Sequence, residues 1–130
     1  MSDVGTVLHE LIRQFYRVQM SKTNPAFMSG VPELLVLKLI SQTEMYGYQL
    51  VRAIRHSTLD SINLAEGVVY PTLHSLESKG LLRSRELTSE GRPRVYYKLT
   101  AKGRKRLQEL TGEWERVSGG INAALGEHYA

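Results

Sequence analysis

Residues 66–99 read EGVVYPTLHSLESKGLLRSRELTSEGRPRVYYKL, and their pattern decides the fold. In the first half, Val69, Leu73 and Leu76 recur at helical spacing, which gives a helix one apolar face. Gly80 follows at the expected end of this helix, because glycine enters the left-handed conformation without a Cβ clash. The first half is therefore predicted to be a helix that buries one side and exposes the other.

The second half of this stretch predicts a basic β-hairpin. Leu81 and Leu82 begin an extended run, and Glu90 and Gly91 supply the turn. Beyond the turn, two sets of residues alternate with the period of a half-buried strand: Val95, Tyr97 and Leu99 against Tyr96 and Lys98. A helix followed by a basic two-stranded hairpin is the winged form of the helix-turn-helix. That motif places the helix in a DNA major groove and the hairpin beside it on phosphates.

Two further helices are predicted ahead of this stretch. Pro32 suits a first helical position, and Glu33–Gln42 is apolar nearly all round, as in a central buried helix. The next helix is expected from about Gly47 to Ser57, with four residues buried: Tyr48, Leu50, Val51 and Ile54. A short connection, Thr58–Ala65, then leads to the third helix, with Asn63 or a neighbour as its N-cap.

A helix is also predicted at each end of the chain. Residues 3–20 form an amphipathic pattern whose apolar stripe must pack on its own subunit or on a dimer partner. A membrane surface is disfavoured, because the polar face is not strongly basic. Thr100 is a suitable N-cap for a final helix from Ala101, whose apolar residues form a seam for helix pairing: Leu107, Leu110, Trp114, Val117, Ile121 and Leu125. Gly119-Gly120 interrupts this seam, and we expect a bend, fraying or a close helix crossing there.

The predicted fold is therefore mainly α with a small β-hairpin. Its expected parts are an N-terminal helix and linker over 1–30, a winged helix-turn-helix over 31–100, and a C-terminal dimerisation helix over 101–130. A chain of 130 residues, 42% of them hydrophobic, is long enough for one domain with such accessory helices.

Basic residues are concentrated in one part of the chain. Residues 79–106 contain ten basic and two acidic side chains, a local net charge of +8 in a chain whose total is +4. This concentration is typical of a surface that binds a polyanion. There is no cysteine, and the four histidines lie on separate predicted elements, so no metal site is expected. A signal-peptide core and a bilayer-spanning apolar run are also lacking, which predicts a cytoplasmic protein without membrane contact.

Candidate DNA-binding residues lie on the second helix, the third helix and the hairpin. They are Gln49, Tyr70, Thr72, His74, Ser75, Lys79, Arg92, Arg94 and Lys98. Arg92 and Arg94 are expected to reach phosphate or the minor groove, and the alternative is a solvated charged hairpin. The third helix has no Arg, Asn or Gln for bidentate base contacts, so more weight falls on DNA shape, or on Gln49 and Arg52 from the second helix.

Four motifs point to a known family: YGYQL at 46–50, GVVYPTLHSLE at 67–77, GLL at 80–82 and GRPRVYYKLTAKG at 91–103. With these motifs, residues 31–118 resemble the PadR family of transcriptional regulators, in its short members with a single C-terminal helix. The resemblance implies a homodimeric repressor that binds double-stranded DNA at a palindromic operator. The N-terminal helical extension is a departure from the family pattern, so it inherits no role.

The resemblance also implies roles for the C-terminal helix. The residues expected to form the dimer are Leu107, Leu110, Trp114, Val117 and Ile121. In some family members a tryptophan on this helix stacks on flat aromatic ligands, and Trp114 stands at the matching place. This implies a small hydrophobic effector that releases the repressor, and the alternative is that Trp114 belongs to the dimer core.

Two other classes of function compete with a DNA-binding regulator. In a protein-interaction module, the winged helix would be a scaffold while the N-terminal helix and the C-terminal seam bind a partner regulator. An enzyme is not expected, because the sequence lacks a nucleophile–base constellation, a phosphate-cradling glycine loop and metal ligands. No cofactor is expected either.

Overall fold

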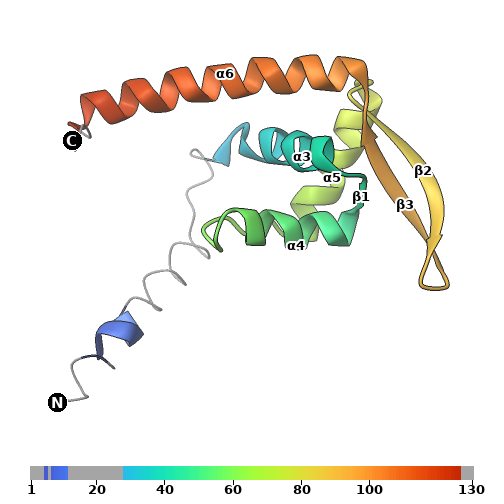
Figure 1. Ribbon diagram of the computed structural model, residues 1–130, viewed down its shortest axis with the longest axis horizontal. Coiled ribbons are helices and arrows are strands. Elements are labelled where there is room, and N and C mark those ends of the chain that lie inside the picture. Colours follow the sequence, from blue (N-terminus) through green and yellow to red (C-terminus); the bar gives the residue numbers. More distant parts are fainter. Residues whose placement is uncertain (1–4, 6, 12–27, 127–130) are drawn as a thin grey trace.

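The computed structural model describes residues 5, 7–11 and 28–126. Its elements follow one another in this order: α3 (Val31–Gln42), β1 (Met45–Tyr46), α4 (Gly47–Ser57), α5 (Glu66–Ser78), β2 (Leu82–Ser89), β3 (Arg92–Leu99) and α6 (Ala101–Ala124). Figure 1 shows α3, α4 and α5 gathered into one body, with the β2–β3 hairpin at its side and α6 across the top. The predicted winged helix-turn-helix is confirmed. Residues 5 and 7–11 are helical, and the rest of the N-terminal helix predicted over 3–20 lies outside the described residues.

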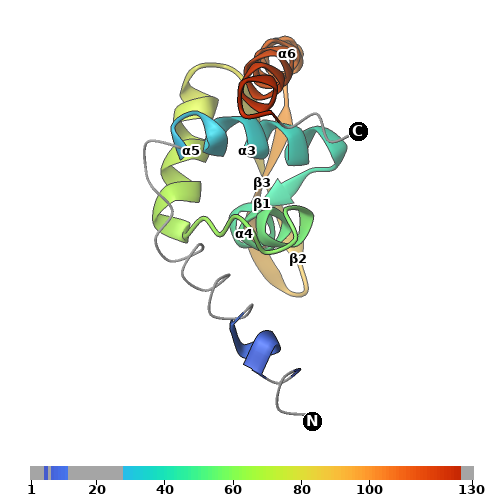
Figure 2. The ribbon, with the colours of Figure 1, turned by 90° about the vertical axis from the view of Figure 1, so that its left-hand side faces the viewer.

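Helix α3 lies at the centre of the body, between α6 and α4 (Figure 2). Proline occupies its first turn, where the missing N–H has no intrahelical partner. The helix contacts α4, α5, α6 and β3, and its buried side chains are Val36, Leu37, Leu39 and Ile40. Burying one such side chain fully contributes about 1.5–3 kcal/mol. The prediction of a central buried helix is confirmed, because neighbours surround α3 on several sides.

Helix α5 buries the face that the sequence pattern predicts. Val69, Leu73 and Leu76 are between 0% and 2% exposed. After the C-cap Lys79, Gly80 has a φ of +77°, the left-handed conformation expected of glycine at that place. Helix α6 begins at Ala101 with Thr100 as its N-cap, whose side chain accepts a hydrogen bond from the Gly103 N–H at 3.0 Å.

The sheet has three strands rather than the two predicted. Its order is β1-β3-β2, and all pairs are antiparallel. The hairpin turn consists of Glu90 and Gly91 with φ of 53° and 76°, and positive values at both positions match the twist of paired strands. The two-residue strand β1 pairs Met45 with Tyr97 and Tyr46 with Tyr96. A strand of two residues is too short to show the alternation by which strands are recognised in a sequence.

Several local predictions were wrong. Tyr48 is 50% exposed, and Gly47 is buried in its place, because α4 turns its first residue rather than its second toward α5. Val95 is 44% exposed, since β1 ends before it along β3 and leaves that part of the strand unflanked on one side. Asn63 does not cap α5; the N-cap is Ala65, with no side-chain hydrogen bond. Helix α6 continues through Gly119-Gly120 to Ala124, so it does not fray there, and a bend or a close helix crossing at the two glycines stays a prediction.

Candidate nucleic-acid interface

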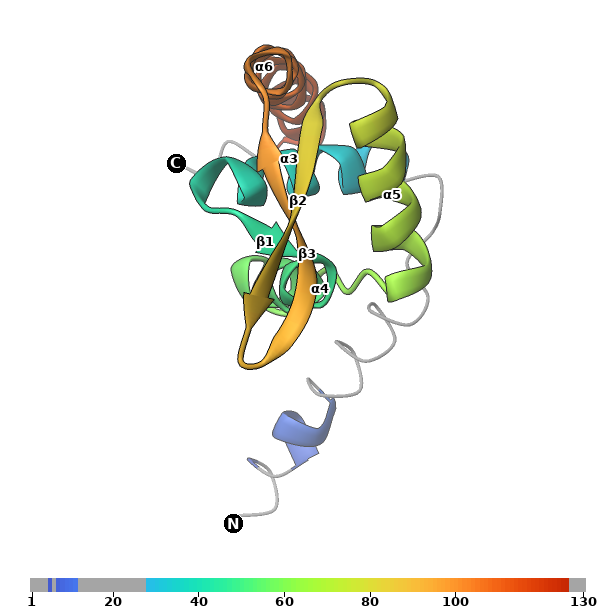
Figure 3. The same cartoon turned by 90° about the vertical axis from the view of Figure 1, so that its right-hand side faces the viewer.

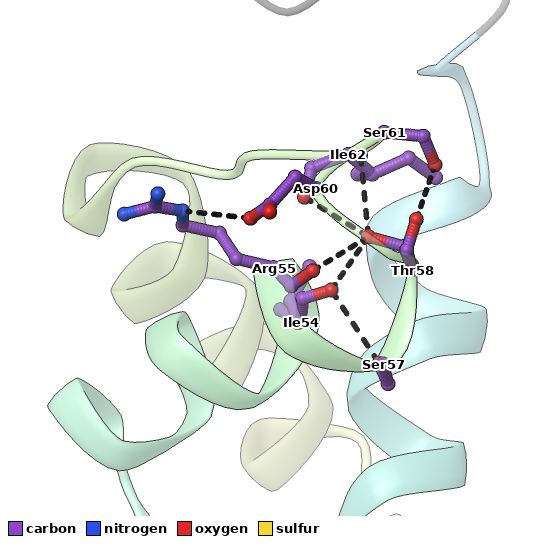
Figure 4. A network of polar contacts seen from close by, with 7 residues as sticks. All are labelled: Ile54, Arg55, Ser57, Thr58, Asp60, Ser61 and Ile62. Atoms are coloured by element: carbon purple, nitrogen blue, oxygen red, sulfur yellow. Dashed lines mark hydrogen bonds and ion pairs between the residues drawn. The ribbon is translucent and has the colours of Figure 1, made fainter.

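Polar contacts order the connection between α4 and α5, the two helices of the helix-turn-helix. Figure 4 shows that its polar contacts converge on Thr58. The Thr58 hydroxyl donates to the Ile54 carbonyl at 2.7 Å and accepts from the Ile62 N–H at 3.2 Å. Leu59 and Asp60 have φ of 53° and 64°, a left-handed conformation that non-glycine residues adopt only where the surroundings hold them. These contacts fix the path of the chain from the end of α4 to Ile62, and the first turn of α5 is closed by the Val68 and Val69 N–H groups, which donate to the Ala65 carbonyl at 2.9 and 3.0 Å.

A groove of about 390 Å³ separates the hairpin from α4 and α5. It is lined by Tyr46, Gly47, Tyr48, Tyr70, His74, Arg92, Pro93, Arg94, Val95 and Tyr97. Two of the residues predicted on α5, Tyr70 and His74, thus share one groove with Arg92 and Arg94 of the hairpin. The structure brings these four candidates together from two elements, α5 and β3.

Close contact between α4 and α5 sets the position of the Tyr70 ring. A Cβ atom added at Gly47 would lie 2.4 Å from Tyr70 Cε1, so only glycine leaves room for the ring. Tyr97 lies on the floor of the groove, and its burial raises the pKa of the hydroxyl above the ordinary value. The nearby Glu77 and Tyr70 raise this pKa further. Glu77 also accepts a hydrogen bond from the Ser84 hydroxyl, which ties α5 to β2.

The other candidates on α5 face a different groove. Thr72, Ser75 and Lys79 line a groove of about 440 Å³ together with residues 28–30 and the start of α3. The Thr72 hydroxyl donates to the Val68 carbonyl of its own helix at 2.7 Å. At the far end of α5, the Lys79 carbonyl accepts from Lys102 Nζ at 2.9 Å, so Lys79 lies beside α6. These three residues are not brought together with Tyr70 and His74.

The two arginines near the hairpin tip lie in different surroundings. Arg92 is exposed directly after the turn. Arg94 is half-buried, with its guanidinium carbon 4.3 Å from the centre of the Tyr46 ring. Its Nε is buried without a hydrogen-bond partner. Tyr46 in turn meets Tyr96 edge to face, with ring centres 5.3 Å apart. The expected contact of both arginines with phosphate or the minor groove stays a prediction, and the structure gives the two side chains different surroundings.

The outer face of the sheet carries further basic residues. Arg83 and Lys98 are exposed and lie directly opposite each other on β2 and β3. Like charges so placed destabilise a sheet, and an anion would relieve the repulsion. Sequence reasoning singled out Lys98 but missed Arg83, which belongs to the same basic cluster over 79–106. Next along β2, Arg85 is neutralised by Glu44, with Nη2 and Oε2 2.7 Å apart.

Gln49 and Arg52 lie apart from the groove beside the hairpin. The Gln49 side chain accepts from the Tyr46 N–H at 3.4 Å and so caps the start of α4. Both side chains line a third groove, of about 620 Å³, with Arg55 and His56 of the same helix. In the described part of the chain, no three His, Asp or Glu side chains gather as a metal site, and no helix is long and apolar enough to cross a membrane.

Helix α6 presents the residues predicted for dimerisation in two groups. Leu107 and Leu110 pack partly against the core of their own subunit. Toward its far end, α6 leaves large apolar side chains exposed, at 39–71% of their surface: Trp114, Val117, Ile121 and Leu125. Arg106 Nε and Glu33 Oε1, 3.1 Å apart, hold α6 to α3, and this contact raises the pKa of Arg106. Beside the pair lies a groove of about 410 Å³ whose lining includes Leu34, Leu110 and Trp114.

Comparison with known proteins agrees with this architecture. The family described as the transcriptional regulator PadR-like family matches residues 36–109, more than half of the chain. The transcriptional regulator Rv3488 of Mycobacterium tuberculosis is 34% identical over 84 residues, which are 64% of this chain and 75% of that protein. The longer transcriptional regulator YqjI of Escherichia coli is 31% identical over 97 residues, 75% of this chain but only 45% of that protein.

Solved structures give the same result. The crystal structure of a PadR-like transcriptional regulator from Bacillus cereus is 33% identical, with a TM-score of 0.68 over 77% of this chain and 96% of that one. Members of the family are non-enzymatic regulators, in agreement with the prediction that the chain is not an enzyme. The sequence motifs, the three-helix body with its wing and these relatives agree: the chain belongs to the PadR-like family of transcriptional regulators.

Proposed function

We propose that this regulator is a repressor that binds a palindromic operator as a homodimer. The observation that carries the proposal is the shared groove of Tyr70, His74 and Arg92. Figure 3 shows that the first turns of α5 and the tip of the hairpin point the same way, away from α6. One face of a DNA duplex can therefore meet both, with α5 in the major groove and Arg92 on the adjacent backbone or minor groove.

The electrostatics support an anionic partner on this face. Among the residues that the structure describes, Arg92 at the tip has no carboxylate within ion-pair distance, whereas Arg85 and Arg106 are paired with glutamates. Lys98 and Arg83 likewise carry uncompensated charge on the wing. Phosphate groups would satisfy these cations and release condensed counterions. On α5, the exposed side chains include Tyr70 and His74 but no arginine, so we expect recognition to depend strongly on DNA shape.

The apolar far end of α6 supports a dimer. Its four exposed residues, Trp114, Val117, Ile121 and Leu125, continue at steps of three and four along one face. A second copy of α6 would bury them and relate the two α5 helices by a two-fold axis. Two-fold symmetry in the protein is matched by a palindromic site whose halves lie about one DNA turn apart.

The groove between α3 and α6 supports a role for a small ligand. Trp114 supplies a flat aromatic surface, and Leu34 and Leu110 supply apolar walls. A hydrophobic effector bound there, next to the proposed dimer contact, would change the spacing of the two α5 helices and lower the affinity for the operator.

The operator is first to be identified by selecting genomic fragments with the purified protein. Binding to the selected fragment is then measured at several salt concentrations for wild type, Arg92→Ala and Arg116→Ala. Each phosphate contact contributes about 0.9 to the slope of log K against log salt, so the loss of Arg92 from both subunits should reduce the slope by about 1.8. Arg116 is the matched control, since it is an exposed arginine on α6, and its slope should equal that of wild type. Equal slopes for all three proteins would remove the wing tip from the interface.

The dimer is tested by Ile121→Asp, which introduces a carboxylate into the α6 seam. Ile121 is 53% exposed, so the fold of the single subunit should tolerate the change. Sedimentation equilibrium should show a mass near 14.7 kDa for this variant and twice that mass for wild type and for Arg116→Ala. A variant that still sediments as a dimer would place the interface elsewhere.

A further inference from the structure

The distal part of the hairpin projects beyond its support. Strand β1 pairs with β3 only at Tyr96 and Tyr97, so residues 86–95, here called the distal wing, have no β1 partner. Within the described part of the chain, the side chains of the distal wing make one hydrogen bond, ion pair or ring contact with the rest of the molecule. It is the contact of Arg94 with the Tyr46 ring. Apart from the β2–β3 pairing, this stack is therefore the side-chain contact that joins the distal wing to the body in the described residues.

The register of the sheet explains why Arg94 reaches Tyr46. Tyr46 lies directly opposite Tyr96, and Arg94 is two residues further along β3 on the same face. Such diagonal neighbours lie about 7–8 Å apart, within reach of a long side chain and an aromatic ring. The guanidinium group, 4.3 Å from the ring centre, is at cation–π distance, and the same ring also meets Tyr96 edge to face.

The exposure of Arg94 separates it from Arg92. Arg94 is half-buried, and its Nε is buried without a partner, so one of its donors faces protein rather than solvent. Arg92 is exposed beside the turn and forms no ion pair with the residues that the structure describes. The two arginines lie on the same hairpin and carry the same charge, but their surroundings differ. Equal charge is therefore no reason to expect that both contact phosphate.

We propose that Arg94 is a positioning residue: its stack on Tyr46 sets the angle of the distal wing, and Arg92 makes the phosphate contact. This inference rests on the proposed DNA-binding function. Tyr46 immediately precedes α4, so the stack connects the wing to the first helix of the helix-turn-helix. The distance between the wing tip and α5, and hence the groove geometry that the protein prefers on DNA, is set through this contact.

The test compares Arg94→Ala, Tyr46→Leu, the double variant and Tyr46→Phe with wild type. Tyr46→Leu keeps all positive charges and most of the apolar volume but removes the aromatic face, whereas Tyr46→Phe keeps that face. Each stack contributes on the order of a threefold factor, and a dimer has two, so Arg94→Ala and Tyr46→Leu should each lower operator affinity about tenfold. The double variant should lose no more than either single variant, because both remove the same contact. Tyr46→Phe should bind as wild type, and the salt slope for Tyr46→Leu should stay unchanged.

The result that overturns the proposal is also definite. If Tyr46→Leu binds as wild type while Arg94→Ala lowers the salt slope by about 1.8, as expected for Arg92→Ala, then Arg94 contacts phosphate directly. Hydrogen exchange of the free protein separates this failure from failure of the DNA-binding function. Backbone amides of residues 86–95 should exchange faster in Arg94→Ala and Tyr46→Leu than in wild type, while those of α3 should not change. Unchanged exchange in the distal wing would refute the stack as its support, whether or not the protein binds DNA.

Discussion

Replacing Gly103 with alanine should destabilise the fold although the residue lies in a helix, where alanine is normally preferred. A Cβ atom at this position would lie 2.1 Å from the Leu81 carbonyl oxygen and 2.8 Å from Leu99 Cδ1. The Leu81 oxygen cannot retreat freely, because it accepts hydrogen bonds from both the N–H and the hydroxyl of Thr100, each at 3.1 Å. Overpacking against backbone costs about 3 kcal/mol at the upper end of its usual range. Helix propensity returns about 1 kcal/mol, so the expected net loss is about 2 kcal/mol.

Gly112 provides a matched control for this prediction. It lies in the same helix, and an added Cβ there has no neighbour within 4 Å, so Gly112→Ala should gain about 1 kcal/mol from helix propensity alone. The assay is urea unfolding followed by circular dichroism, with all proteins at one concentration because the stability of the proposed dimer would depend on concentration. If Gly103→Ala were as stable as wild type, the start of α6 could not be held against Leu81 as described. If both variants were destabilised equally, the loss would reflect alanine in α6 generally and not the contact at Gly103.

Two further changes test local contacts. Thr100→Ala should lower the free energy of unfolding by about 1 kcal/mol, because the hydroxyl accepts from the Gly103 N–H at 3.0 Å and donates to the Gly80 carbonyl at 2.7 Å. In urea unfolding, Thr100→Ser should recover most of this loss. An equal loss in both variants would exclude the cap as its cause. Burial raises the pKa of Tyr97 above its ordinary 10.0, so the unfolded chain loses this proton first as pH rises, and wild-type stability should fall above pH 10.0. Unfolding at a series of pH values from 9 upward should show a shallower fall for Tyr97→Phe, and parallel curves would contradict this assignment.

The helices and the hairpin could be predicted from sequence because their signals are local. Glycine in the turn after α5, Thr100 as the cap of α6 and the apolar spacing along α5 each act within one or two helical turns. The Thr100 cap predicted the start of α6 to the residue, and the bounds predicted for α4, about Gly47 to Ser57, also match the structure. The same local reasoning failed for the N-cap of α5, which is Ala65, a residue that makes no side-chain hydrogen bond there.

The arrangement of the candidate site could be predicted only in part, because it depends on contacts between distant segments. Arg92 and Arg94 look equivalent in the sequence, and only the pairing of Tyr46 with Tyr96 brings an aromatic ring beneath one of them. Similarly, Thr72 and His74 are both polar residues of α5, yet they line different grooves. Residues two positions apart in a helix, such as Thr72 and His74, point in directions about 200° apart. Their spacing therefore shows which of them faces the candidate site only when the side of the helix that faces the site is already known.

The bonding at the start of α6 makes that helix a lever. Its 24 residues extend about 36 Å, and its first turn is fastened through Thr100 to the carbonyls of Gly80 and Leu81, directly after α5. A tilt of about 5° about this fulcrum would move the far end by about 3 Å. Conversely, a few ångströms of displacement among the apolar residues at the far end become a small rotation at the junction of α5 and the wing. A displacement of several ångströms at the far end of α6 would thus be reduced to a small change of angle at its first turn.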